Sequence, residues 1–144
     1  ERTGRKRKEK AQGLQFEGWV GNILPLNNFI PAGTVIFKRD LFDQIGGFDT
    51  QGLKLEDWDF LIRSAFCTPF CYVNEDLLIY RLHGESAIAK MRENGILFDE
   101  KMKVLRKNRH LLNPLVYVAS VAINFALDRV VRPLATKFRG RGVG

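Results

Sequence analysis

Residues 45–66, which read IGGFDTQGLKLEDWDFLIRSAF, give the most direct indication of the fold. In its second half, apolar residues recur three and four positions apart, which is the spacing of one helix face. These residues are Trp58, Leu61, Ile62 and Ala65. The sequence therefore predicts a helix over residues 56–66 that turns one side towards a hydrophobic core.

Three carboxylates lie within the first four positions of this predicted helix: Glu56, Asp57 and Asp59. Capping and compensation of the helix dipole are enough to explain acidic residues in a first turn. On a helix, Glu56 and Asp59 share a face, whereas Asp57 points about 100° away. A carboxylate held at a helix start beside a glycine loop can also act as a general base towards a hydroxyl nucleophile. The residues alone leave both interpretations open.

The residues before this helix predict a strand followed by a short helix. Residues 34–37 are β-branched or aromatic, which is typical of a buried strand. Asp40 is a suitable cap for a helix over residues 41–45. Gly46 and Gly47 follow, and glycine commonly ends a helix because it adopts a positive φ.

Two further strands are predicted after the central helix, over residues 70–73 and 77–81. Strands that alternate with helices indicate a layered α/β domain. The last strand ends in Arg81, which can pair with a carboxylate or a phosphate. His83 follows as a candidate metal ligand or diphosphate contact, although a lone histidine is more often an ordinary surface residue.

The C-terminal third of the chain is predicted to be helical. Residues 87–109 form a basic amphipathic segment that Asn94-Gly95 interrupts, and residues 111–127 are much more apolar. Seventeen residues are marginal for a membrane span, which needs about 20. A packed or oligomer-forming helix, a helix in the membrane interface and a true span all remain open.

Charge is unevenly spread along the 144 residues, which carry 23 basic and 16 acidic side chains and a net charge of +7. Residues 101–144 hold ten Lys or Arg against one acidic residue, Asp128, whereas residues 11–100 are acidic overall. No basic platform interleaved with aromatic residues is evident. The sequence therefore argues against a nucleic-acid-binding protein.

Taken in order, the motifs between residues 30 and 86 resemble the C-terminal, acceptor-side half of a family 2 glycosyltransferase with the GT-A fold. The motifs are Pro31 to Phe42, Ile45-Gly46-Gly47-Phe48-Asp49, Glu56-Asp57-Trp58-Asp59, and Tyr80-Arg81-Leu82-His83 with Ser86. The resemblance implies an α/β fold: a partial GT-A-like domain of short strands and helices, with a C-terminal helical extension. The expected organisation is a basic flexible tail over 1–13, the half-domain over 14–110 and the helical extension over 111–144.

The resemblance also implies a reaction, an inverting transfer of a sugar from a nucleotide-sugar donor to an acceptor hydroxyl. In the family, the aspartate of the Glu-Asp pair is the general base, a role that falls to Asp57. Glu56 and Asp59 would orient the base or the acceptor. Gly46 and Gly47 would line the donor-sugar and acceptor site, because glycine allows close approach.

Donor chemistry follows from the same resemblance. His83 would lie near a divalent cation, Mg²⁺ or Mn²⁺, and the diphosphate, and Arg81 would help to neutralise the leaving group. The expected partners are a nucleotide-sugar, a glycan or lipid-linked acceptor and a membrane surface. The expected location is cytoplasmic and peripheral at the membrane.

One feature departs from the family pattern, because no Asp-x-Asp motif precedes residue 30. The nucleotide-binding half that carries this motif in the family is missing, which would leave a sheet edge exposed. A longer enzyme, a partner chain or self-association would cover that edge. The alternative function is a non-catalytic domain, derived from a glycosyltransferase, that mediates oligomer or membrane-surface contacts.

Overall fold

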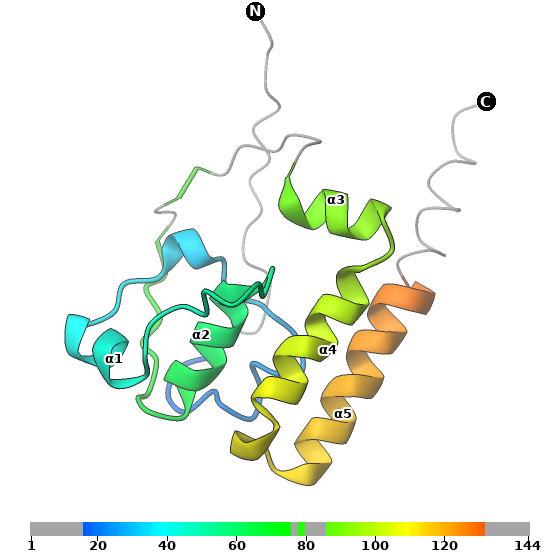
Figure 1. Cartoon of the computed structure of the whole chain (residues 1–144). Coiled ribbons are helices and arrows are strands. Elements are labelled where there is room, and N and C mark those ends of the chain that lie inside the picture. Colours follow the sequence, from blue (N-terminus) through cyan, green and yellow to red (C-terminus); the bar gives the residue numbers. More distant parts are fainter. Residues whose placement is uncertain (1–15, 76–77, 80–85, 132–144) are drawn as a thin grey trace, which may run out of the picture.

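Helices joined by extended segments and turns make up the described part of the chain (Figure 1). The computed structural model describes residues 16–75, 78–79 and 86–131. The helical elements are η1 (Ala32–Thr34), α1 (Arg39–Gln44), α2 (Glu56–Ala65), α3 (Ala87–Glu93), α4 (Leu97–Lys107), η2 (Arg109–Leu111), α5 (Pro114–Phe125) and η3 (Ala126–Val131). The predicted tail over 1–13 lies outside the described residues.

Helix α2 forms the centre of the core, and its predicted apolar stripe is confirmed. Trp58, Leu61, Ile62 and Ala65 are all buried. Phe60 is buried as well, so α2 is enclosed on more than one side. The indole Nε1 of Trp58 donates a hydrogen bond to the carbonyl oxygen of Leu24, at 3.1 Å, which ties the first described segment to this helix.

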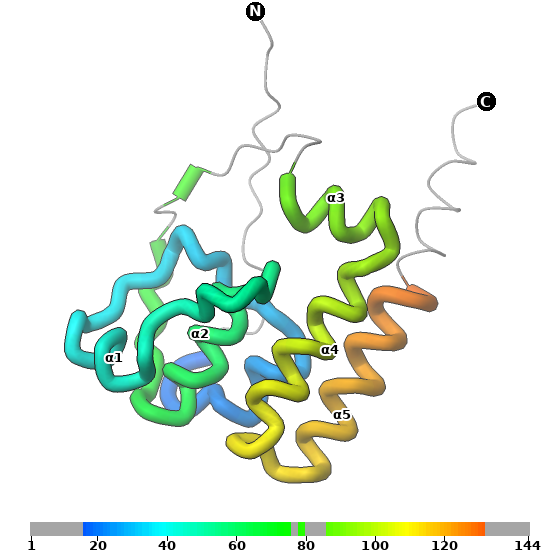
Figure 2. The backbone as a smooth tube through the Cα atoms, viewed as in Figure 1, coloured from blue at the N-terminus to red at the C-terminus, as the bar shows by residue number. Residues whose placement is uncertain are grey.

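The predicted break at Asn94-Gly95 is also confirmed. Asn94 ends α3, and Gly95 adopts a φ of 70°, which an L side chain rarely allows. The chain then turns into α4, which contacts both α2 and α5. In Figure 2, α4 and α5 run alongside one another over most of their lengths.

Helix α5 begins where proline and asparagine favour a helix start. The side chain of Asn113 accepts a hydrogen bond from the backbone N–H of Leu115, at 2.9 Å, and Pro114 occupies the first turn, where its missing N–H costs nothing. The π-helical segment η3 continues α5, so residues 114–131 form one helical rod. By length and composition this rod could cross a membrane.

The expected α/β fold is wrong for the described residues, in which no strand is assigned. Their strand-like pairing is a single antiparallel bridge between Gly18 and Phe70. A strand exists only through hydrogen bonds to a neighbouring strand. In residues 34–37, Thr34 belongs to η1 and Val35 is extended, but no described segment pairs with them.

The other two predicted strands are not seen in the described residues either. In residues 70–73, only Phe70 forms a β-bridge with another described residue, Gly18. Most of residues 77–81 lie outside the described residues, and Leu78 and Ile79 are not in a strand. The described residues therefore do not show the partial GT-A sheet that the resemblance implies.

Helix α1 forms close to its predicted position but is not capped by Asp40. The helix begins at Arg39 with Lys38 as its N-cap, and no side chain caps it. Asp40 lies in the first turn instead, where its charge is favourable to the helix dipole.

Candidate functional site

The loop after α1 is shaped by Gly46 and Gly47, as the sequence predicts. Both have positive φ, of 79° and 67°. The N–H of Gly46 donates to the carbonyl of Asp43, and the N–H of Gly47 donates to that of Phe42. This pair of bonds is the Schellman arrangement, which satisfies carbonyls at a helix end.

The two glycines differ in what surrounds them. A Cβ on Gly47 would lie 2.7 Å from the ring of Phe42, whereas nothing lies within 4 Å of a Cβ on Gly46. Phe42 belongs to an aromatic cluster with Phe37, Phe48 and Phe60, whose ring centroids lie 4.7 to 5.8 Å apart. The close approach at Gly47 is therefore explained by packing against an aromatic ring.

A hollow of about 400 Å³ lies beside this loop. It is lined by residues 45–51, Arg63 and Lys107. Gly46 and Gly47 thus border an open space. Asp57 and Glu56 do not line it.

Arg63 joins α2 to the loop. Its guanidinium donates to the carbonyl oxygens of Ile45, at 2.5 Å, and Gly47, at 2.7 Å. The same guanidinium makes two hydrogen bonds to Oδ2 of Asp59, one turn earlier on α2. Because the guanidinium is planar and rigid, these bonds fix the loop relative to the helix.

Asp59 is fully buried and surrounded by donors. Besides Arg63, its Oδ2 accepts from Nζ of Lys107, at 2.9 Å, and its Oδ1 accepts from Nδ2 of Asn108, at 2.7 Å. Lys107 and Asn108 lie at the end of α4. This placement makes Asp59 a link between α2, α4 and the glycine loop, and its saturated carboxylate is unsuited to orienting an acceptor.

Lys107 also reaches Asp49 in the loop, with its Nζ 2.5 Å from Oδ2. That hydrogen bond, together with one from the backbone N–H of Gln51, holds the pKa of Asp49 below its usual value of 3.8. The spacing of Asp59 and Arg63, four residues apart, is a signal that the sequence offered for part of this network. Nothing in the sequence pointed to Lys107, which lies 48 residues from Asp59.

Asp57 has a different environment from Asp59. It is half-buried in the first turn of α2, and its Oδ1 accepts a hydrogen bond from the N–H of Trp58, at 2.7 Å. Within the described ranges, no cation pairs with it. Burial, and to a smaller extent the charge of Glu56, raises the pKa of Asp57 above 3.8, although the bond from Trp58 acts in the opposite direction. Glu56 itself is exposed.

The predicted donor-side residues, Arg81 and His83, lie outside the described residues. Among residues 16–75, 78–79 and 86–131, no group of three or more His, Cys, Asp or Glu side chains is placed to hold a metal ion. The predicted Mg²⁺ or Mn²⁺ site thus depends on a part of the chain for which no geometry is described.

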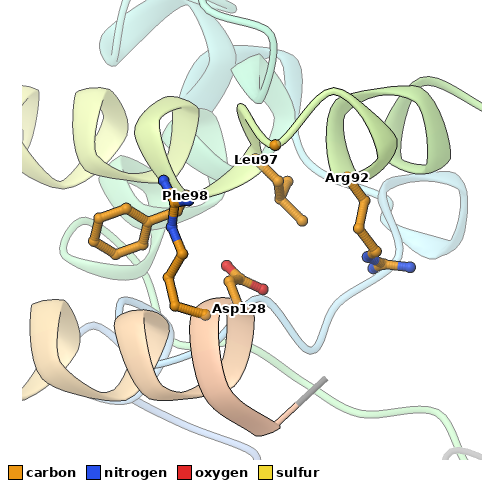
Figure 3. Close-up of a pocket in the computed structure, with 6 residues that line it drawn as sticks. Arg92, Leu97, Phe98 and Asp128 are labelled. Atoms are coloured by element: carbon orange, nitrogen blue, oxygen red, sulfur yellow. The ribbon is translucent and has the colours of Figure 1, made fainter. Parts of the chain in front are cut away.

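A second, smaller hollow of about 60 Å³ lies between the start of α4 and the end of the C-terminal rod. Figure 3 shows Asp128 pointing from η3 towards Leu97 at the start of α4. Asp128 forms an ion pair with Lys101, at 2.6 Å, and both side chains are buried. A space of this size suits a few water molecules and not a sugar.

Comparison of the chain with protein-family models, with curated proteins and with solved structures returned no match.

Proposed function

We propose that the chain is the acceptor-side part of a glycosyltransferase in which Asp57 acts as the general base. In this reaction an acceptor hydroxyl gives its proton to the Asp57 carboxylate as its oxygen attacks the anomeric carbon of a nucleotide-sugar. The bond from that carbon to the diphosphate breaks, and the nucleotide leaves with the bonding electrons. The configuration at the anomeric carbon inverts.

The observation that carries the proposal is the contrast among the three carboxylates at the start of α2. Asp59 is saturated by Arg63, Lys107 and Asn108. Glu56 is exposed, so nothing shields it from solvent. Asp57 is the carboxylate that is both partly shielded and not paired with a cation within the described ranges.

The environment of Asp57 supports this role. A general base is most effective when its pKa lies near the working pH, and partial burial moves the pKa of Asp57 in that direction. The residue that follows it, Trp58, is anchored in the core through the carbonyl of Leu24. A base at this position is therefore held on a rigid element.

The experiment measures sugar transfer by the full-length protein. A panel of radiolabelled nucleotide-sugars is offered with glycan and lipid-linked acceptors, with and without Mn²⁺. Loss of a general base costs about 100-fold or more in rate, so Asp57→Asn should lower transfer by at least that factor. Asp40→Asn is the matched control because it makes the same change at an exposed carboxylate in the first turn of α1.

Both variants are checked by circular dichroism and thermal melting before transfer is compared. Transfer by folded Asp57→Asn within a few-fold of the parent would contradict the assignment of the base. If no nucleotide-sugar supports transfer by the parent protein, the catalytic proposal itself fails, and a non-catalytic interaction domain becomes the better explanation.

A further inference from the structure

The C-terminal rod turns polar side chains towards the rest of the protein. Ser120 and Asn124 are completely buried, and the buried carboxylate of Asp128 is paired with Lys101 of α4. The amide of Asn124 donates to the carbonyl oxygens of Pro25 and Leu26, at 3.3 and 3.1 Å. Because these three residues are four positions apart, they form one stripe along one helix face.

The opposite face of the rod is apolar and exposed. Leu115, Val118 and Phe125 have exposed fractions of 80%, 64% and 50%. Ala122 is exposed on the same face. Val118 precedes Ser120 by two positions and Ala122 precedes Asn124 by two, and a helix turns about 200° over two residues. The apolar stripe and the polar stripe therefore lie on opposite sides.

The usual surface helix of a soluble protein buries its apolar side. In this rod Tyr117 and Val121 pack against the core, but a second apolar face stays exposed. In the buried polar stripe, the amide nitrogen of Asn124 donates to carbonyls of the first described segment, and Asp128 pairs with Lys101. Oδ1 of Asn124 accepts no hydrogen bond from the described residues. The contacts that are made orient the rod. An apolar face that is held outwards in this way needs an apolar neighbour.

We propose that this neighbour is the surface of a bilayer that contains anionic lipids, with α5 lying in the plane of the interface. The charge of this part of the chain favours such a surface. Residues 101–144 hold ten basic residues and one acidic residue, Asp128. A basic excess remains after Lys101, Lys103 and Lys107 are set against their acidic ion-pair partners. Basic residues attract anionic headgroups, and an apolar helix face then inserts among the lipids.

The same charge disfavours a second copy of the chain as the neighbour. Two copies joined through this face would bring two strongly basic regions together, with like charges repelling one another. An anionic bilayer reverses the sign of that interaction. Charge complementarity therefore selects the lipid surface.

The rod lies on the bilayer and does not cross it while the observed packing is kept. Helix α4 contacts α5 and carries the charged, exposed residues Lys103 and Arg106. Carrying these charges into the hydrocarbon region would be costly. Only the outward face of α5 can enter the lipid, to the shallow depth that is typical of interfacial helices.

Co-sedimentation of the full chain with vesicles tests the proposal. The chain should bind vesicles of phosphatidylcholine with phosphatidylglycerol, bind phosphatidylcholine alone more weakly, and lose binding as salt rises. The triple variant Leu115→Gln, Val118→Gln, Phe125→Gln should bind the anionic vesicles at least about tenfold more weakly, because three apolar side chains no longer enter the lipid. Its fold should persist, because Leu115 and Val118 are mostly exposed and Phe125 gives up one edge-to-face contact with Phe98 of α4.

A matched control removes exposed apolar side chains elsewhere. Ile36 and Val73 have exposed fractions of 98% and 58%, and the double variant Ile36→Gln, Val73→Gln should bind vesicles as the parent does. Equal binding by the triple variant and the parent would overturn the proposal, as would the absence of any binding by the parent. Conversion of a dimer to a monomer by the triple variant, with vesicle binding unchanged, would assign the face to a second copy.

Depth in the membrane separates a lying helix from a spanning one. Cys67 and Cys71, which are free and exposed, are replaced by serine, and a fluorophore is attached at a cysteine introduced in place of Val118. Quenching by lipids labelled near the headgroup should exceed quenching by lipids labelled at the chain ends. The reverse order would overturn the lying arrangement. Both outcomes are independent of the sugar-transfer measurement, because this inference does not rest on the proposed function.

Discussion

At the scale of single residues, two aspartates two positions apart in α2 show how environment decides what a carboxylate can do. Asp59 contacts two cations and an amide, and it holds three parts of the fold together. Asp57 is half-buried, with the indole-bearing Trp58 fixed beside it. The sequence motif contains both residues, but only the contacts distinguish a structural carboxylate from one that is available for chemistry.

The raised pKa of Asp57 predicts an effect on stability as well as on catalysis. The folded state holds the Asp57 proton more tightly than the unfolded state, so the fold loses stability as the pH rises above 3.8 and through the raised pKa. That loss persists at neutral pH. Asp57→Asn should therefore be more stable than the parent at pH 7, by about 0.5 kcal/mol or less because solvent screens a half-exposed group.

Thermal and urea melts over a series of pH values measure this effect. The advantage of Asp57→Asn should shrink as the pH falls towards 3.8, where the carboxyl of the parent also becomes neutral in the unfolded chain. A stability difference that does not change with pH would contradict the prediction. Higher stability together with lost transfer would be typical of a residue kept for function.

At the scale of elements, the sequence predicted what depends on neighbours along the chain. The stripe of α2, the glycine pair after α1 and the break at Asn94-Gly95 are local signals, and the structure confirms each. The predictions of strands over 34–37 and 70–73 were wrong, because a strand needs a neighbouring strand, which local composition does not specify. Phe37, for instance, packs against Phe60 of α2.

The orientation of α5 could not be predicted for the same reason. Its apolar composition indicates a helix, but which side faces inwards depends on what lies beneath it. The carbonyl oxygens of Pro25 and Leu26 lie there and accept hydrogen bonds from the amide of Asn124. The amine of Lys101 also lies there and pairs with Asp128. The same limit applies to the candidate site. The sequence motifs contain Asp57, Asp59 and the glycine pair, but no sequence pattern indicated that Lys107 contacts Asp59.

The ion pair between Lys101 and Asp128 predicts how firmly the end of the rod is held to α4. Both side chains are more than nine-tenths buried. Asp128→Asn leaves the charge of Lys101 buried without its counter-charge, so it should lower the free energy of unfolding by about 3 to 5 kcal/mol. Urea unfolding at neutral pH measures this loss.

Two control variants separate the effect of burial on stability from the effect of leaving Lys101 without its counter-charge. Asp43→Asn removes half of the exposed pair with Arg39 and should cost no more than about 1 kcal/mol. The double variant Lys101→Met, Asp128→Asn removes the uncompensated charge and should recover most of the lost stability. A cost below about 1 kcal/mol for Asp128→Asn alone would show that the pair is not held as the structure describes.

At the scale of the whole molecule, the described chain divides into a helical core and extended segments that lack regular backbone partners. Helices α2 and α4 supply fully buried residues, among them Ile62, Val104 and Leu105. Residues 35–38 and 71–74 form no ladder with any described residue, and Ile36 is almost fully exposed. Amide hydrogens in the two kinds of segment should therefore exchange at very different rates.

Hydrogen exchange followed by mass spectrometry tests this expected difference in amide exchange rates. Amides of α2 and α4 should exchange at least about 1,000-fold more slowly than in an unfolded chain, because they open only when the core unfolds. Amides of residues 35–38 and 71–74 should exchange at nearly the unfolded rate. Protection of these residues to the level of α2 would mean that they are paired in a sheet, and would contradict the helical description. If that protection grew with protein concentration, the pairing would lie between copies of the chain.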